Sequence, residues 1–215
     1  KRDAVINVAN GRREHGMLPS SITNAQDYPD FTRGAIVHRQ NYDESLLLGP
    51  LAAATDREQY TLEFAMHWDK KLPTTTWNYG YMAFGRSHDG PLGIAGKFRG
   101  ASEDGCYVLA LRPGAKVRDE HGKYRTGDLA QLIRLDGGPG ASREGKVLHT
   151  MNLKKPIKPN ESIEGKIVVK GKYFYFVING QYSAQIHDSA YRGPYVHFGR
   201  YHGNATGGPL VLTRA

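Results

Sequence analysis

The sequence predicts an all-β fold, in which one domain of 215 residues forms a two-sheet antiparallel β-sandwich. Glycine and proline, 26 and 11 residues, recur at intervals that separate apolar segments of strand length. From Tyr60 to Trp68 apolar and polar residues alternate, which is the pattern of a strand with one buried face. Asn179-Gly180, the preferred pair of a type I′ turn, lies between two apolar β-rich runs and predicts a hairpin.

The remaining elements follow from the same signals. Residues 1–30 are expected to be irregular except for a short strand at Ala4–Val8, because Asn, Gly, Pro and Ser recur there. The longest later irregular stretch is expected at Pro113–Asp128. Two packed, curved sheets are the economical way to cover many strand faces. The other expected strands are Ala35–Gln40, Asn78–Gly85, Ile94–Arg99, Tyr107–Arg112, Ala130–Leu135, Lys146–Asn152, Lys166–Val169, Tyr173–Ile178, Gln181–His187, Tyr195–Tyr201 and Leu210–Thr213.

Composition narrows the class of partner. The 29 Lys and Arg residues against 21 Asp and Glu give a net charge of +8, which favours a polyanion such as nucleic acid, anionic lipid or an acidic polysaccharide. The basic residues are scattered and form no nucleic-acid-binding signature, so no nucleic acid is expected. No apolar run approaches the roughly 18 residues of a membrane helix. We therefore expect a soluble monomer, and the sign of the charge alone does not choose between anionic lipid and an acidic polysaccharide.

Cysteine and glycosylation signals bear on the compartment. Cys106 stands alone, so no intramolecular disulfide and no Cys-based metal site is expected. Asn160 and Asn204 each begin an N-glycosylation sequon. These signals agree with a secreted, extracellular protein.

The run from residue 195 to 201 is the most informative strand for function. Val196 and Phe198 point to one face and belong to the core. The opposite face has the composition of a sugar-binding sheet, because rings stack on sugars and a glycine leaves room for a ligand. A solvated strand with cross-strand aromatic pairs is the structural alternative. This opposite face carries Tyr195, His197, Gly199 and Tyr201.

This strand resembles the C-terminal strand of the jelly-roll alginate lyases of polysaccharide lyase family seven and of their relatives, the glucuronan lyases. The family strand reads Tyr-Phe-Lys-Ala-Gly-Val-Tyr-Asn-Gln, and its second Tyr is the catalytic acid and base. The pattern places that Tyr on Tyr201, while His202-Gly203 replaces the closing Asn-Gln. The resemblance implies a concanavalin-like jelly roll with a concave substrate cleft. It also implies a lyase that cleaves a uronic-acid polymer, glucuronan or alginate, by β-elimination.

A second family motif, Gln-Ile-His, has two candidate counterparts. Its Gln helps to neutralise the uronate carboxylate and its His contributes to proton abstraction. A literal Gln185-Ile186-His187 ends only 14 residues before Tyr201, too close for the family's order. Gly85-Arg86-Ser87-His88 ends 113 residues before Tyr201 and matches the position better, which would put Arg86 in the Gln place and His88 in the His place. For His88 an ordinary loop histidine is the alternative.

Further basic residues resemble the positions that hold an acidic chain in this family. The family's N-terminal strand carries two arginines around a glutamate, and Arg33–Asn41 contains His38 and Arg39 without that spacing. His38 and Arg39 lie on opposite faces of that strand, and either face could serve a cleft. Lys97 and Arg99 alternate onto one face of a short run. A surface strand is the alternative for His38 and Arg39, and solvated surface charges are the alternative for Lys97 and Arg99.

β-Elimination requires neutralisation of the C6 carboxylate, a base for the C5 proton and an acid for the departing O4. Arg, His and Tyr side chains supply all three, so no cofactor is required. The resemblance implies that Tyr201 is the acid and also a candidate base. His88 or His38 is then the base or its orienting group. The candidate partners of the carboxylate are Arg39, Arg86 and Asn78.

Two other functions fit the same fold class. A non-catalytic lectin or carbohydrate-binding module would stack sugars on the aromatic side chains of Trp77, Tyr79, Tyr81 and Tyr201. A retaining glycoside hydrolase needs two carboxylates about 5 Å apart, usually in a Glu-x-Asp-x-x-Glu motif. Glu63 and Asp69 flank a strand with the wrong spacing. A structural calcium ion is a further expectation for such sandwiches, with Asp27, Asp30 and Asp188 as available oxygen ligands.

Overall fold

The computed structural model describes residues 4–7, 35–38, 46–51, 53, 55–89, 105–137, 145–201 and 207–213. These residues form two β-sheets, and none of them belongs to a helix that could cross a membrane. One sheet contains β1 (Ala4–Asn7), β2 (Ala35–His38), β4 (Gln59–Trp68), β9 (Ile163–Lys170), β10 (Tyr173–Ile178), β11 (Gln181–Tyr182) and β13 (Leu210–Thr213). The other contains β3 (Leu46–Pro50), β5 (Tyr79–Gly85), β6 (Cys106–Arg118), β7 (Tyr124–Leu135), β8 (Lys146–Asn152) and β12 (Gly193–Tyr201).

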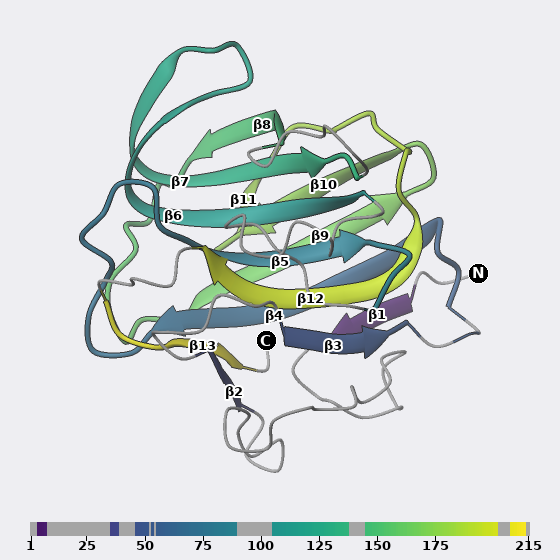
Figure 1. The fold of residues 1–215 in the computed structure, drawn as a ribbon, viewed down its shortest axis with the longest axis horizontal. Coiled ribbons are helices and arrows are strands. Elements are labelled where there is room, and N and C mark those ends of the chain that lie inside the picture. The colour runs from purple at the N-terminus through teal and green to yellow at the C-terminus, as the bar shows by residue number, and fades with distance from the viewer. Residues whose placement is uncertain are drawn as a thin grey trace.

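The strand order brings distant parts of the chain together. The seven-stranded sheet runs β11-β10-β9-β4-β13-β2, with β1 added in parallel beside β4. The six-stranded sheet runs β3-β12-β5-β6-β7-β8, and all its pairs are antiparallel. In Figure 1 the six-stranded sheet lies across the front of the molecule and the other sheet behind it. The predicted two-sheet sandwich of the jelly-roll kind is confirmed.

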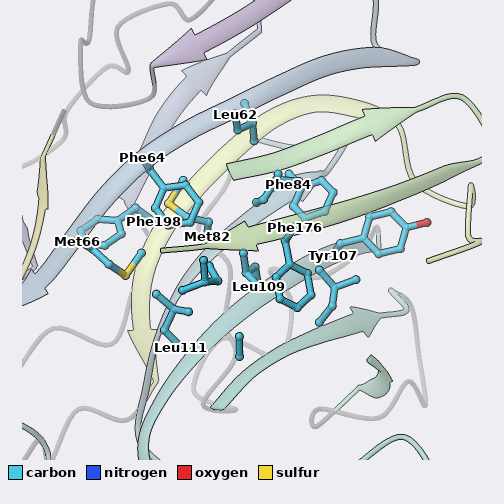
Figure 2. Close-up of a cluster of buried hydrophobic side chains, with 14 of the residues drawn as sticks. Leu62, Phe64, Met66, Met82, Phe84, Tyr107, Leu109, Leu111, Phe176 and Phe198 are labelled. Carbon is cyan, nitrogen blue, oxygen red and sulfur yellow. The ribbon is translucent and has the colours of Figure 1, made fainter. Parts of the chain in front are cut away.

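The core between the sheets forms from the faces that the alternation predicts. Leu62, Phe64 and Met66 of β4 are fully buried, as is Trp68 at its end. They meet the inward side chains of the facing sheet in one apolar cluster (Figure 2). Burial of each such side chain is worth about 1.5–3 kcal/mol. From the six-stranded sheet the cluster includes Met82, Phe84, Tyr107, Leu109, Leu111 and Phe198.

The Asn179-Gly180 hairpin forms as predicted, and the strand after it is shorter than predicted. Both residues have positive φ, 48° and 76°, as a type I′ turn requires. β11 covers only Gln181–Tyr182 of the expected Gln181–His187. The Ser183 hydroxyl accepts a hydrogen bond from the Phe176 N–H at 2.9 Å, and this side chain takes part in the pairing just where β11 ends.

The expected irregular stretch at Pro113–Asp128 is wrong. β6 and β7 continue through it as one long hairpin, which projects beyond the neighbouring strands in Figure 1. Pro113 and Gly114 form a bulge, where the register between the strands shifts. Gly114 has a φ of 55°, and its N–H donates to Asp128 Oδ1 at 2.8 Å. The turn-forming residues therefore bend the hairpin and do not end the strand.

The outward face of the six-stranded sheet, which points away from the other sheet, carries a second apolar cluster. It includes Tyr79, Tyr81 and Ala83 of β5 and the buried thiol of Cys106. Gly199 of β12 lies against the Tyr81 phenol, where any Cβ atom would overlap the ring. The side chains of this outward face are therefore closely packed, and they lie beneath the candidate site.

The expected strand Ile94–Arg99 lies outside the described residues, and the single-domain organisation over residues 1–215 stays a prediction.

Candidate functional site

A cleft of about 520 Å³ opens on the outward face of the six-stranded sheet, beside Tyr201. Its walls come from β5, β6, β7, β8, the end of β12 and the tip of the β6–β7 hairpin. Its lining combines aromatic rings with charged groups of both signs. The side chains used below are Trp77, Tyr79, Tyr201, Arg112, Arg118, Lys146, Asp119, Glu120 and Gln131.

One wall is aromatic. Tyr201 and Tyr79 are directly opposite in the antiparallel β12–β5 pair, and their rings stack with centroids 4.9 Å apart and planes 10° from parallel. Tyr79 is 6% exposed, and its burial raises its pKa even though Arg112 acts to lower it, so the phenol stays neutral at physiological pH. Trp77 lies two residues earlier and is 49% exposed. The wall therefore offers an accessible indole beside a fixed pair of phenols.

Arg112 places a positive charge on this aromatic wall. Its guanidinium carbon lies 4.3 Å from the centroid of the Tyr79 ring, a cation–π geometry. Burial lowers the pKa of Arg112, and the phenols of Tyr79 and Tyr201 act in the opposite direction. Within the described residues no carboxylate pairs with this guanidinium, and its buried Nε has no hydrogen-bond partner. A partly buried cation without a counter-ion attracts an anionic ligand.

A second wall is the tip of the β6–β7 hairpin, whose shape is stabilised by hydrogen bonds within the hairpin. Asp119 accepts from the N–H groups of His121 and Lys123 at 2.9 and 3.0 Å, and from Arg125 Nε at 3.2 Å. Burial would raise the pKa of Asp119, but these donors lower it. The carboxylate is therefore ionised, and its oxygens already accept hydrogen bonds from the hairpin. Arg118 donates to the Gly122 carbonyl at 2.9 Å. The tip therefore presents Arg118 to the cleft in a fixed position.

Two oxygen atoms on the walls remain unsatisfied. Gln131 is fully buried and donates through Nε2 to the Arg118 carbonyl and to Thr150 Oγ1, both at 3.0 Å, while its Oε1 has no partner among the described residues. Glu120 Oε1 lies 4.0 Å from His149 Nδ1, and its buried Oε2 likewise lacks a partner there. An unsatisfied buried polar group costs about 1–3 kcal/mol. Both oxygens are therefore acceptors that a ligand in the cleft could satisfy.

Of the predicted site residues on β12, Tyr201 is the one that lines the cleft. His197 faces the same way but is fully buried and pairs with Ala83. It is four residues from Tyr201, about 13 Å along the strand. Tyr195 is half-buried and lies about 20 Å from Tyr201 by the same rise. The strand alternation was predicted correctly, but the strand extends too far for all three residues to meet one small ligand.

Arg86 and His88 do not come together with Tyr201. Tyr201 pairs with Tyr79 at the start of β5, whereas Arg86 and His88 follow the end of that strand. The seven residues from Tyr79 to Gly85 alone span about 20 Å. Arg86 is buried and its backbone pairs with Tyr195, and His88 is exposed. The expected grouping of these residues in one site therefore does not form, because the sheet register separates them.

The other expected site residues lie elsewhere. Asn78 is buried, donates to Thr75 Oγ1 and does not line the cleft. The backbone of His38 belongs to β2 in the seven-stranded sheet, away from the sheet that carries Tyr201. The side chain of His38 lies outside the described residues, as do Arg39, Lys97 and Arg99.

The calcium expectation concerned three aspartates. Asp27 and Asp30 lie outside the described residues. Asp188 accepts hydrogen bonds from the Tyr107 hydroxyl, from Arg134 at 2.9 Å and from the Ala190 N–H at 3.2 Å. Among the described residues no cluster of three or more His, Cys, Asp or Glu could hold a metal ion. A structural calcium ion stays a prediction.

The sequence interpretation missed the charged residues of the cleft. Arg112 ends the predicted strand Tyr107–Arg112, and alternation puts it on the face opposite Leu111. That signal was available, but its value depends on knowing that β6 lies beside β5, which in turn lies beside β12. Arg118 and Glu120 fell within the stretch that was expected to be irregular, so no face was assigned to them.

Comparison with protein families finds no match for this sequence, and comparison with curated proteins finds none either. Among solved structures, the chain is similar to the metal-free carbohydrate recognition domain of Emp46p, with a TM-score of 0.55 and 12% identity over 90% of this chain and 92% of that chain. It also aligns with alginate lyase AlgAT5 of Polysaccharide Lyase family 7, with a TM-score of 0.47 and 11% identity over 90% and 82% of the two chains. A third match is the carbohydrate-binding module CBM66 from Bacillus subtilis, with a TM-score of 0.47 and 15% identity over 73% of each chain. The Emp46p similarity agrees with the two-sheet jelly-roll architecture.

Proposed function

We propose that this chain binds an acidic polysaccharide, a polymer of uronic acid, in the cleft beside Tyr201. The observation that carries the proposal is the position of Arg112, a guanidinium stacked on Tyr79 with no carboxylate partner among the described residues. A uronate offers an apolar ring face and a carboxylate, so one sugar can stack on an aromatic ring and pair with an arginine. The exposed ring of Trp77 lies two residues before Tyr79.

The remaining charges and the fold support this class of ligand. Arg118 and Lys146 add positive charge along the cleft, and the carboxylate of Asp119 is already occupied by its own hairpin. The fold is shared with a domain that is named for carbohydrate recognition. We extend carbohydrate binding to this chain because it has such a cleft, and the positive side chains along the cleft specify an acidic polymer.

Binding measurements test the proposal. Calorimetry with polyglucuronate, alginate and a neutral glucan should show binding of the acidic polymers only. Arg112→Gln should weaken that binding by about tenfold or more, because it removes a desolvated charge partner. Arg57→Gln is the matched control, since Arg57 is exposed on the turn before β4. Equal binding of the neutral glucan, or unchanged affinity of Arg112→Gln, would show that the cleft does not recognise uronates.

β-Elimination in the same cleft is a second candidate function, which the proximity of Tyr201 to Arg112 favours. A uronate carboxylate on Arg112 would have its charge neutralised, which acidifies the C5 proton. Tyr201, acting as its phenolate, would then take the C5 proton and pass it to O4, so that the C4–O4 bond breaks, a C4–C5 double bond forms and the phenolate is regenerated. Both side chains that take part in this step, Arg112 and Tyr201, belong to this protein.

The products separate the candidate functions. Shorter chains that absorb ultraviolet light through an unsaturated uronate indicate a lyase. Reducing ends without that absorbance indicate a hydrolase. Binding with an unchanged polymer size over a long incubation indicates a binding module.

A further inference from the structure

Three buried polar atoms without a hydrogen-bond partner among the described residues lie on the walls of the same cleft. They are Arg112 Nε, Glu120 Oε2 and Gln131 Oε1, one donor and two acceptors. Folded proteins pair nearly all of their buried polar atoms, so three such atoms around one cleft need an explanation. A ligand that supplies one acceptor and two donors would satisfy all of them.

The Gln131 amide has only one orientation that fits its neighbours. Its Nε2 faces the carbonyl oxygen of Arg118, which can only accept a hydrogen bond. If the amide were turned over, two acceptors would face each other. Gln131 therefore keeps its oxygen as the unsatisfied atom, and a hydroxyl group is the simplest donor for it.

Among the described residues, Glu120 has no Lys or Arg within salt-bridge distance. Its nearest positive candidates are His121 Nε2 and His149 Nδ1, at 3.9 and 4.0 Å, which pair with it only when protonated. Burial lowers the pKa of His149, although Glu120 opposes this, so the imidazole is neutral at physiological pH. Glu120 therefore accepts hydrogen bonds from neutral donors and repels a second anion.

We infer that the cleft selects uronates whose ring hydroxyls are free, with the carboxylate on Arg112 and hydroxyl groups donating to Glu120 and Gln131. This inference rests on the proposed function and defines its substrate class more narrowly. An O-acetyl group has no proton to donate, so acetylation leaves the two acceptors unsatisfied. A sulfate group would bring negative charge to Glu120. Unsubstituted polyuronates should therefore bind better than heparin, despite the higher charge of heparin.

Calorimetry at one fixed ionic strength tests the inference with four polymers of similar length. These are polyglucuronate, its O-acetylated derivative, its methyl ester and heparin. For the unaltered protein, acetylation and esterification should each weaken binding by about tenfold, since each removes partners of buried groups. This part of the test needs no variant, so it does not depend on whether a substituted protein folds.

Glu120→Gln then identifies the residue that rejects sulfate. The ratio of polyglucuronate to heparin affinity should fall by about tenfold in this variant, because the repelling charge is gone. Glu164→Gln is the matched control, since Glu164 is exposed on β9 in the other sheet, and its ratio should not change.

The outcomes distinguish the inference from the function on which it rests. Equal binding of polyglucuronate and its acetylated form, or an unchanged ratio in Glu120→Gln, would overturn the inference and leave uronate binding intact. Failure of every acidic polymer to bind would overturn the proposed function and the inference with it.

Discussion

Tyr201 stacks on Tyr79 with their ring centroids 4.9 Å apart and their planes 10° from parallel. Because the stacking involves the rings, Tyr201→Phe should keep the pair and remove only the hydroxyl. If Tyr201 is the acid of a lyase, this variant should lose about 100-fold or more in the rate of unsaturated product formation. Its affinity for the polymer should change little.

Tyr79→Phe is the control for this variant, because it removes a phenol from the same stacked pair. It should retain most of the rate. A Tyr201→Phe protein that forms unsaturated product at the original rate would remove Tyr201 from the chemistry, whatever its role in binding.

Trp77 should contribute to binding and not to stability. Its indole is 49% exposed, so Trp77→Ala removes a platform for a sugar ring without opening the core. We expect affinity for polyglucuronate to fall by about fivefold to tenfold, with an unchanged thermal transition. Tyr182→Ala is the control, since Tyr182 is 69% exposed in β11 of the other sheet. Equal losses in both variants would indicate non-specific adhesion and not a site at Trp77.

Gly199→Ala should destabilise the protein, because a Cβ at this position would overlap the phenol of Tyr81. We expect a loss of about 1–3 kcal/mol in the free energy of unfolding, measured with urea. Gly171→Ala separates steric overlap from backbone strain, since Gly171 has a φ of 58° with open space around it. That control should cost about 1 kcal/mol or less. Equal stability of Gly199→Ala and the original protein would mean that β12 can move away from Tyr81.

Asp188 should make folding sensitive to acid. Burial would raise the pKa of this carboxyl, but hydrogen bonds from Tyr107, the Ala190 N–H and Arg134 lower it below the ordinary value of 3.8. A carboxyl whose pKa is depressed in the folded state stabilises the fold above its unfolded pKa, and that contribution disappears as the pH falls through the folded value.

Urea midpoints measured between neutral pH and about pH 3 check this expectation. The decline on acidification should be shallower in Asp188→Asn than in the original protein. Asp89→Asn, which alters an exposed carboxyl, should follow the original curve. If Asp188→Asn gave the same slope, other carboxyls would account for the acid sensitivity.

Local patterns predicted most strands, because strand formation here follows residue alternation and turn chemistry. The buried residues Leu62, Phe64 and Met66 lie on the predicted face of β4. Asn179 and its glycine neighbour adopt the predicted turn. Both signals involve residues adjacent in sequence, which a single sequence can reveal.

The site was harder to predict, because it depends on which strands are neighbours and in what register. Tyr201 was found from its own strand, whereas Arg112 reaches it only because β5 lies between β12 and β6 and pairs with both. His88 was favoured by its sequence position, yet the register places it at the far end of β5. A one-residue shift in register exchanges the faces of a strand, so single-strand patterns do not define a site formed by several strands.

The self-supporting tip of the β6–β7 hairpin has a consequence for evolution and engineering. Its turn is held by Asp119 with the N–H groups of His121 and Lys123, and Gln131 donates to the backbone carbonyl of Arg118, so most of the hydrogen bonds that shape the tip do not involve the side chains of Arg118 and Glu120. Arg118 and Glu120 can therefore be exchanged while the two packed sheets stay as they are. A library confined to this short stretch of the chain would sample new ligand preferences on a scaffold that has already folded.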